Sequence, residues 1–342
     1  MSSSELVLWC ALAIGMAFGV IGQITGFCLN RGLRDYWVSH HPNKLRAFVL
    51  AMAVAIIGTQ GAATLGIIDL ESAIYLVPTV SWLLLPAGAV MFGYGMILAN
   101  GCGARALVLL GQGNARSLVV LVFMGISAYV TLTGLFAPLR IEISTATSMT
   151  NGSLSTLSLA ARAACTTAIV LALLCFALWR VELLKKKSDL LSGLSVGLLI
   201  IAGWLTTGWI GADEFEPTPV ASLTFVAPVG EAIQYAMIAT GMQFRFGAAI
   251  VVGVIFGSIL TALFRRKFHI HGFHSPEQTF RSIVGGVLMG VGGALASGCS
   301  VGQGLTGMST LAYESMLATV GIFLGGWLAL RTHKSAGHSE AS

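Results

Sequence analysis

Charged side chains are scarce in this chain. Of 342 residues, only 10% are Asp, Glu, Lys or Arg, whereas 56% are hydrophobic. Soluble domains average about 25% charged residues. Apolar runs of about 20 residues recur throughout the sequence, and each is long enough to cross a bilayer as a helix. The composition therefore excludes an ordinary soluble enzyme and indicates a polytopic protein embedded in the lipid bilayer, with no soluble domain.

Several recognisable motifs are also missing. The six cysteines include no CxxC pair, which argues against a disulfide framework or a zinc ribbon. No Lys or Arg precedes the first apolar run, so we expect a retained helix rather than a signal peptide. The net charge of +5 comes from short loops and does not indicate nucleic-acid binding. No cofactor or metal is expected, because His269, His271 and His274 have no Cys or carboxylate spaced to complete a site.

Nine apolar stretches are predicted to span the membrane. Their bounds are 6–28, 46–68, 82–99, 117–137, 159–181, 190–211, 245–264, 281–297 and 314–331. The stretches 102–112 and 300–311 are too short to span, and we expect them to form re-entrant half-helices. Pro and Gly interrupt 220–243, which predicts a broken re-entrant pair. A surface hairpin in the outer leaflet is the alternative for this stretch.

The loop charges predict the orientation. Loops after the first, fifth, seventh and last spans carry Arg31, Arg34, Lys44, Arg46, Arg180, Lys185, Lys186, Lys187, Arg265, Arg266, Lys267, Arg281, Arg331 and Lys334. The opposite loops carry Asp69, Glu71, Asp213, Glu214 and Glu216. The positive-inside rule then places the N-terminus outside and the C-terminus in the cytoplasm.

One Gly-rich stretch occurs twice. GAVMFGYGMILANGC (Gly88–Cys102) and GGVLMGVGGALASGC (Gly285–Cys299) share four glycines, a Leu-Ala step and a final Gly-Cys at a shift of 197 residues. The loop charges place the copies in opposite orientations, which is the signature of inverted-topology transporters. We therefore predict an all-α membrane protein with an inverted internal repeat. Its expected divisions are 1–158 (first repeat), 159–189 (linking helix and basic loop), 190–334 (second repeat) and 335–342 (disordered tail).

Three cysteines lie at the ends of predicted helices. Cys102 and Cys299 end the two copies, and Cys28 lies where the first span gives way to a loop. Cys10, Cys165 and Cys175 have apolar neighbours and are expected to pack as small hydrophobes. The glycines beside the terminal cysteines are expected to permit positive φ and close approach to a ligand. The other candidate contacts are Asn100, Gly101, Gly103, Arg105, Gln112, Asn114, Ser297, Gly298, Ser300, Gln303 and Thr306.

These groups predict a site for a small anion with a sulfur-compatible surface. No Asp or Glu falls in mid-span, apart from Glu231 in the interrupted stretch. Half-helix N-termini offer free N–H donors and partial positive charge, and thiols, hydroxyls and amides add weak donors. Arg105 either draws the anion inward or anchors a helix end at the headgroups. Two alternatives are a membrane thiol-disulfide oxidoreductase and a structural protein in which the cysteines only pack.

These motifs resemble those of the YeeE/YedE family of sulfur transport proteins. The matching segments are GFCLNRGLRDYW (26–37), ANGCGARALVLLGQGN (99–114) and VLMGVGGALASGCSVGQGLTG (287–307). The resemblance implies an inner-membrane protein, not an enzyme, that takes up thiosulfate or a related sulfur species. It also implies a central path lined by Cys28, Cys102 and Cys299, and a separate cytoplasmic sulfur carrier of the TusA type as partner. Arg105 and Gln112 depart from the family pattern, which leaves other sulfur or selenium species open as substrates.

Overall fold

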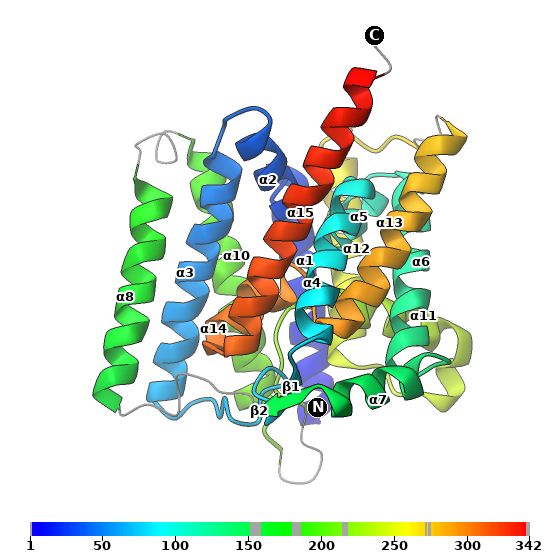
Figure 1. Cartoon of the computed structure of the whole chain (residues 1–342). Helices are drawn as coiled ribbons and strands as arrows, with labels where there is room; N and C mark the ends of the chain where they lie inside the picture. Colours follow the sequence, from blue (N-terminus) through cyan, green and yellow to red (C-terminus); the bar gives the residue numbers. More distant parts are fainter. Residues whose placement is uncertain are drawn as a thin grey trace.

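The structure, a computed structural model, describes residues 2–150, 159–179, 186–213, 218–270, 272 and 275–339. Arg180, Lys185, Glu214, Glu216, His271, His274 and residues 340–342 lie outside this part of the chain. The described chain forms a helical bundle with one small two-stranded sheet (Figure 1). The prediction of an all-α membrane protein is therefore confirmed.

Eight segments are long and apolar enough to cross a membrane within the described residues. The long helices are α1 (Ser3–Thr25), α3 (Asn43–Thr64), α4 (Leu84–Leu98), α6 (Ala115–Leu132), α8 (Leu159–Leu178), α10 (Lys187–Leu205), α12 (Phe246–Phe264), α13 (Pro276–Leu295) and α15 (Tyr313–Ser339). All but α13 belong to those eight segments. The ninth predicted span is thus a long helix inside the bundle, but Glu277, Arg281 and five glycines lower its hydropathy.

Shorter elements connect the long helices. They are α2 (Leu29–Trp37), β1 (Thr79–Ser81), α5 (Gly103–Gly111), α7 (Ala137–Ala146), β2 (Ser148–Thr150), a π-helical turn (Thr206–Ile210), α11 (Val226–Ile238), a 3-10 turn (Ala239–Gly241), a second π-helical turn (Gly302–Gly307) and α14 (Met308–Thr310). Strands β1 and β2 pair antiparallel with Thr79 opposite Thr150. The sheet and α7 lie at the end of the bundle that carries the N-terminus, and the C-terminus lies at the other end (Figure 1).

Helices α4 and α13, the two copies of the Gly-rich stretch, pack against each other in opposite directions. A Cβ added at Gly88 would lie 2.7 Å from the Gly292 carbonyl oxygen, and one added at Gly95 would lie 2.8 Å from that of Gly285. At the shift of 197 residues, Gly88 corresponds to Gly285 and Gly95 to Gly292. Each contact is therefore the counterpart of the other, as at a two-fold interface.

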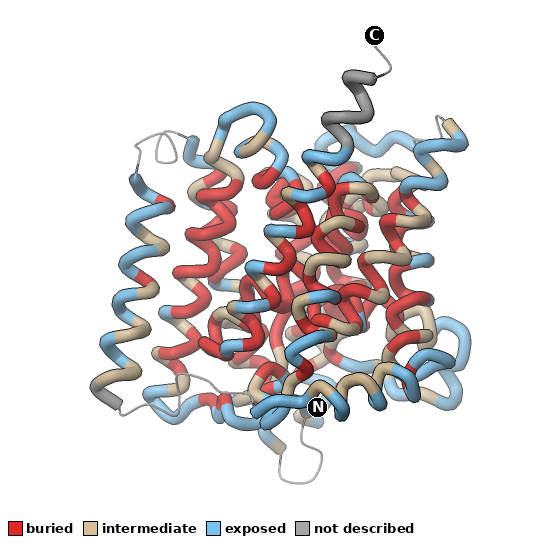
Figure 2. The backbone as a smooth tube through the Cα atoms, viewed as in Figure 1, coloured by how far each residue is buried: buried red, intermediate tan, exposed pale blue. Residues whose placement is uncertain are grey.

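The other helix contacts occur in matching pairs. Helix α4 packs on α15 as α13 packs on α6, and α1 packs on α12 as α10 packs on α3. Helix α5 touches α1, α6 and α12, whereas the second π-helical turn touches α10, α15 and α3. An inverted repeat would give contacts in such pairs, and the repeat itself stays a prediction. Buried residues fill the middle of the bundle, and α8 lies at its edge with mostly unburied residues (Figure 2).

The stretch 220–243 differs from the prediction of a broken helical pair. Residues 218–225 form neither helix nor strand, and a single helix, α11, follows from Val226. Pro228 lies in the first turn of α11, where a missing backbone N–H costs nothing. The irregular segment 218–225 finds its hydrogen bonds elsewhere: Thr207 bonds both backbone groups of Ala221, and the Thr306 hydroxyl donates to the Leu223 carbonyl.

Helix α15 continues to Ser339, beyond the predicted tail boundary after Lys334. The stretch 332–339 contains no proline and a single glycine, so nothing in the sequence stops the helix there.

Candidate functional site

Burial separates the six cysteines into two groups. Cys28, Cys102 and Cys299 are 6%, 2% and 1% exposed. Cys10 and Cys165 are partly exposed, and Cys175 is exposed. The three cysteines at predicted helix ends are therefore the buried ones, whereas the three expected to be buried packing residues are more accessible. A residue on the lipid-facing side of a membrane helix can be apolar without being buried in protein.

Each buried cysteine precedes a short helical element. Cys28 is the N-cap residue of α2, Cys102 is the N-cap residue of α5, and Cys299 lies shortly before the second π-helical turn. The Cys299 sulfur accepts a hydrogen bond from the Gly302 N–H at 3.2 Å. The N–H groups of Arg31 and Arg105 face the other two thiols without forming a capping hydrogen bond. All three thiols therefore lie at positively polarised helix ends.

The Gly-rich helices α4 and α13 end in the same way just before their cysteines. The Gly101 N–H donates to the Met96 carbonyl at 3.0 Å, and the Gly298 N–H donates to the Gly293 carbonyl at 2.8 Å. This six-to-one hydrogen bond defines a Schellman cap. Both caps therefore turn the chain sharply at the same position of each repeat.

The left-handed residues of these caps are Asn100 and Ser297, with φ of 59° and 54°. The expectation of positive φ at the glycines beside the cysteines is therefore wrong. Glycine instead permits close packing at these positions. A Cβ at Gly103 would lie 2.8 Å from the Met124 side chain, and one at Gly298 would lie 3.0 Å from the Gln303 side chain.

Cys28 and Cys102 lie together. Their side chains interact, and the Ser300 hydroxyl also faces the Cys102 thiol. The Asn30 amide donates to the Met96 carbonyl at 3.2 Å, which fixes the start of α2 against the end of α4. Ser300 is 1% exposed, and its oxygen has no hydrogen-bond partner among the described residues. We call Cys28, Cys102 and Ser300 the paired-thiol cluster.

Arg105 flanks the paired-thiol cluster. Its guanidinium donates to the Gly22 carbonyl of α1 at 3.3 Å and interacts electrostatically with Cys28. The side chain is half-buried inside the protein. Arg105 therefore ties α5 to α1 while placing a positive charge beside a thiol.

Cys299 has different neighbours. Its sulfur lies 3.9 Å from the Thr224 hydroxyl oxygen. A Cβ added at Gly302 would lie 2.5 Å from that oxygen and 3.2 Å from the Tyr75 hydroxyl. Tyr75 is 1% exposed, and its hydroxyl has no hydrogen-bond partner of suitable geometry among the described residues. Cys299, Thr224, Tyr75 and Gly302 form a second group of polar atoms, which we call the single-thiol cluster.

The two clusters adjoin through neighbouring residues of the chain. Ser300 follows Cys299 and faces Cys102, whose thiol faces Cys28. The order of contacts from the single-thiol cluster is therefore Cys299, Ser300, Cys102 and Cys28.

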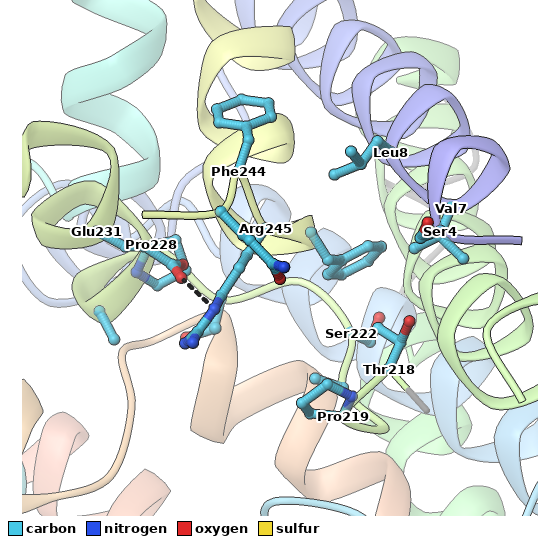
Figure 3. A pocket seen from close by; sticks show the side chains of 16 residues that line it. Ser4, Val7, Leu8, Thr218, Pro219, Ser222, Pro228, Glu231, Phe244 and Arg245 are labelled. Atoms are coloured by element: carbon cyan, nitrogen blue, oxygen red, sulfur yellow. Dashed lines mark ion pairs between the residues drawn. The ribbon is translucent and has the colours of Figure 1, made fainter. Parts of the chain in front are cut away.

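A cavity of about 600 Å³ opens beside the single-thiol cluster. Its walls come from the start of α1, the irregular segment 218–225, α11 and the start of α12. Thr224 lines the cavity and also touches the Cys299 thiol. In Figure 3, Glu231 and Arg245 lie on one side, and Ser4, Thr218 and Ser222 lie on the other. Thr224 is therefore the residue that links the cavity to the single-thiol cluster.

Four other predicted contacts lie outside the two clusters. Asn100 is exposed and accepts from Arg34, Ser297 is exposed, and Asn114 caps α6. Gln112 lies in the turn after α5, where its carbonyl accepts from the His269 N–H. Gln303, in contrast, is fully buried, and its N–H donates to the Cys299 carbonyl at 2.7 Å. Its side chain joins the Ala296 carbonyl to the Ser315 hydroxyl and so holds the chain after α13 beside Cys299.

The structure adds three residues that sequence reasoning missed. Tyr75 and Thr224 belong to segments without a helical pattern, so only the folded chain brings them to Cys299. Glu314 is 2% exposed, and both carboxylate oxygens lack a hydrogen-bond partner among the described residues. Glu314 lies at the edge of the predicted span 314–331, so the sequence did not indicate that its side chain is buried. Among the described residues, no group of three or more His, Cys, Asp or Glu side chains could hold a metal ion.

Comparisons with known proteins identify the family to which this chain belongs. Residues 25–328 match the family described as "Sulphur transport". The chain belongs to the sulphur transport family. The matched region includes all three buried cysteines, together with Tyr75 and Thr224.

Two relatives match the chain over nearly its whole length. The thiosulfate transporter TsuA of Escherichia coli K12 is 25% identical over 336 residues, which cover 93% of this chain and 92% of that protein. TsuA of Spirochaeta thermophila is 24% identical and covers 94% and 97%, respectively. The probable transporter YedE of Salmonella typhimurium is 30% identical over 94 residues, or 27% of this chain and 21% of that protein. The predicted resemblance to the YeeE/YedE family is confirmed.

Proposed function

We propose that this protein takes up thiosulfate, or a closely related sulfur anion, across the inner membrane. One observation carries the proposal: three cysteines at the starts of short helical elements are buried, and Thr224, which contacts the Cys299 sulfur, lines a cavity. Full-length similarity to proteins named thiosulfate transporters supports the substrate. The protein acts as a transporter, and its thiols bind the anion without breaking a bond in it.

The proposed path starts in the cavity at the N-terminal end, which the loop charges assign to the periplasm. The anion first meets the hydroxyls of Thr224 and Tyr75 beside Cys299. It then passes Ser300 to reach Cys102 and Cys28, and Arg105 balances its charge on the cytoplasmic side. Neutral thiols and hydroxyls donate weak hydrogen bonds, so they can replace water around the anion without holding it.

A cytoplasmic sulfur carrier of the TusA type is the proposed receiving partner. The end of the bundle that carries the C-terminus is the one that the loop charges assign to the cytoplasm (Figure 1). The carrier would therefore collect the anion, or sulfur from it, after the anion leaves Cys28.

Growth on thiosulfate tests this function. The chain is expressed in a bacterial strain unable to assimilate sulfate, with thiosulfate as the sole sulfur source and with or without a TusA-type protein. Growth that depends on the chain supports the proposal. No growth in either background, with the protein present in the membrane, contradicts it.

The interaction between Cys28 and Cys102 is the one observation that favours the thiol-disulfide oxidoreductase alternative. That function requires the two thiols to exchange electrons with an external dithiol. The purified chain would then oxidise or reduce a small dithiol in detergent, at a rate abolished by Cys28→Ala. Transport without such exchange excludes the alternative.

A further inference from the structure

The cavity contains one exposed cation held loosely by one mostly buried acid. Of the residues that line it, Glu231 and Arg245 are the charged ones. The Arg245 side chain is 70% exposed and that of Glu231 is 13% exposed. Their closest atoms, Arg245 Nε and Glu231 Oε1, are 3.7 Å apart, beyond hydrogen-bond distance. The remaining N–H groups of the guanidinium therefore have no bond to Glu231 (Figure 3).

The surroundings of Arg245 suit a small oxyanion. Arg245 is the N-cap residue of α12, a 19-residue helix, and Phe246 and Gly247 of its first turn also line the cavity. A guanidinium matches oxyanions with two parallel N–H groups, and a helix N-terminus adds favourable potential. Thr218 and Ser222 line the other side of the same cavity (Figure 3).

Glu231 competes with an anion for Arg245. Arg245 at the start of α12 and Tyr129 of α6 are the groups that interact with its carboxyl. Burial raises the pKa of Glu231, an effect that Arg245 opposes. A raised pKa means that Glu231 binds its proton at a higher pH than an ordinary glutamate does. A protonated Glu231 no longer attracts the guanidinium, so acidification leaves Arg245 free to bind an anion.

We propose that Arg245 is the capture site for the divalent sulfur oxyanion at the outer cavity, and that Glu231 weakens this capture by competing for the same guanidinium. The proposal rests on the proposed function for its substrate. It makes Arg245 a binding residue and Glu231 a tuning residue that acts through it.

Initial rates of labelled thiosulfate uptake into proteoliposomes test the pair. Arg245→Gln is expected to raise KM by about tenfold or more, since a charge-assisted contact is lost. Arg245→Lys is expected to restore part of the affinity, because lysine keeps the charge without the fork geometry. Glu231→Gln is expected to lower KM. If the ion pair only held α11 against α12, Arg245→Gln and Glu231→Gln would not shift KM in opposite directions.

The matched control is Arg140→Gln. It removes one positive charge from α7, at the same end of the bundle but outside the cavity (Figure 1), and it is expected to leave KM unchanged. In the unmutated chain KM falls as the pH is lowered and Glu231 becomes protonated, and in Glu231→Gln it stays level. Equal or same-sign KM changes in Arg245→Gln and Glu231→Gln overturn the proposal.

A binding measurement separates this proposal from the proposed function. Calorimetric titration of the detergent-purified chain with thiosulfate, and with sulfate as the sulfur-oxyanion comparison, gives the affinity without transport. Binding that weakens in Arg245→Gln and strengthens in Glu231→Gln supports the capture site even if the liposomes take up nothing. Uptake by the unmutated chain with no effect of either substitution keeps the transport function and overturns the capture site.

Discussion

At the scale of single residues, the hydroxyls beside the thiols are unusual for buried polar groups. The oxygens of Ser300 and Tyr75 have no hydrogen-bond partner among the described residues. Most buried polar atoms in proteins are bonded, so exceptions call for an explanation. A transported anion would supply acceptors for both hydroxyls as it passes Cys299 and Cys102.

Tyr75 gives the first test. Burial raises the pKa of its hydroxyl far above the usual range, so the group remains a neutral donor at every physiological pH. Tyr75→Phe removes only this donor and is expected to weaken the apparent affinity for thiosulfate by about 10-fold to 100-fold, as for a hydrogen bond to an anion. Uptake kinetics at two pH values check this. A loss of affinity that varies with pH would contradict the neutral-donor role.

Ser300 gives the second test, because stability and function are expected to change in different directions. Ser300→Ala removes an unsatisfied hydroxyl, so unfolding in detergent is expected to occur at the same or a higher temperature. Thiosulfate uptake is expected to fall severalfold. Ser309 is the control, since it accepts from the Trp204 indole at 3.0 Å and donates to the Thr306 carbonyl at 2.6 Å. Ser309→Ala is expected to cost about 1–3 kcal/mol.

Sequence reasoning could mark a residue only where a local pattern existed. Cys28, Cys102 and Cys299 each follow a glycine-containing helix end, and all three are buried, but their role in a path stays a prediction. Tyr75 and Thr224 carry no such pattern. They lie near Cys299 in segments that form neither helix nor strand, and this placement depends on tertiary contacts.

At the scale of elements, glycine determines how closely α4 and α13 approach. A Cβ at Gly292 would lie 2.5 Å from the Phe92 nitrogen and 2.7 Å from the Gly88 carbonyl oxygen. Both neighbours belong to the backbone and cannot move without shifting the helix. The contact therefore positions both cysteine-bearing helix ends at once.

Gly292→Ala is expected to destabilise the protein by about 1–3 kcal/mol through overpacking and to reduce uptake. Gly61→Ala in α3 is the control, because nothing lies within 4 Å of the added Cβ. This substitution is expected to be neutral or to stabilise by up to about 1 kcal/mol. Thermal unfolding of the three purified proteins is the measurement. Equal effects at both glycines would contradict the packing role.

Element prediction was accurate for long apolar runs and poor for irregular backbone. The predicted span 245–264 corresponds to α12 at Phe246–Phe264. The interrupted stretch 220–243 instead begins with residues 220–225, which form neither helix nor strand, and continues as one helix, α11. Thr207 and Thr306, which satisfy this backbone, are distant in sequence. Local composition could signal a break but could not supply those partners.

At the scale of the whole molecule, the termini lie at opposite ends of the bundle (Figure 1). The loop charges assign the N-terminus to the periplasm and the C-terminus to the cytoplasm. A reporter that is active only in the periplasm is expected to work at the N-terminus and fail at the C-terminus. A reporter that is active only in the cytoplasm is expected to show the reverse. The same result at both termini would contradict this topology.

The central proposal is that thiosulfate crosses the membrane beside the buried thiols Cys299, Cys102 and Cys28. The most direct measurement is labelled thiosulfate uptake into proteoliposomes by the purified chain and by four single variants. Cys28→Ala, Cys102→Ala and Cys299→Ala are each expected to reduce uptake by about tenfold or more, since each removes a donor from a narrow path. Cys165→Ala, at a partly exposed cysteine of α8, is expected to transport like the unmutated chain. Full uptake by all three path variants would contradict the claim.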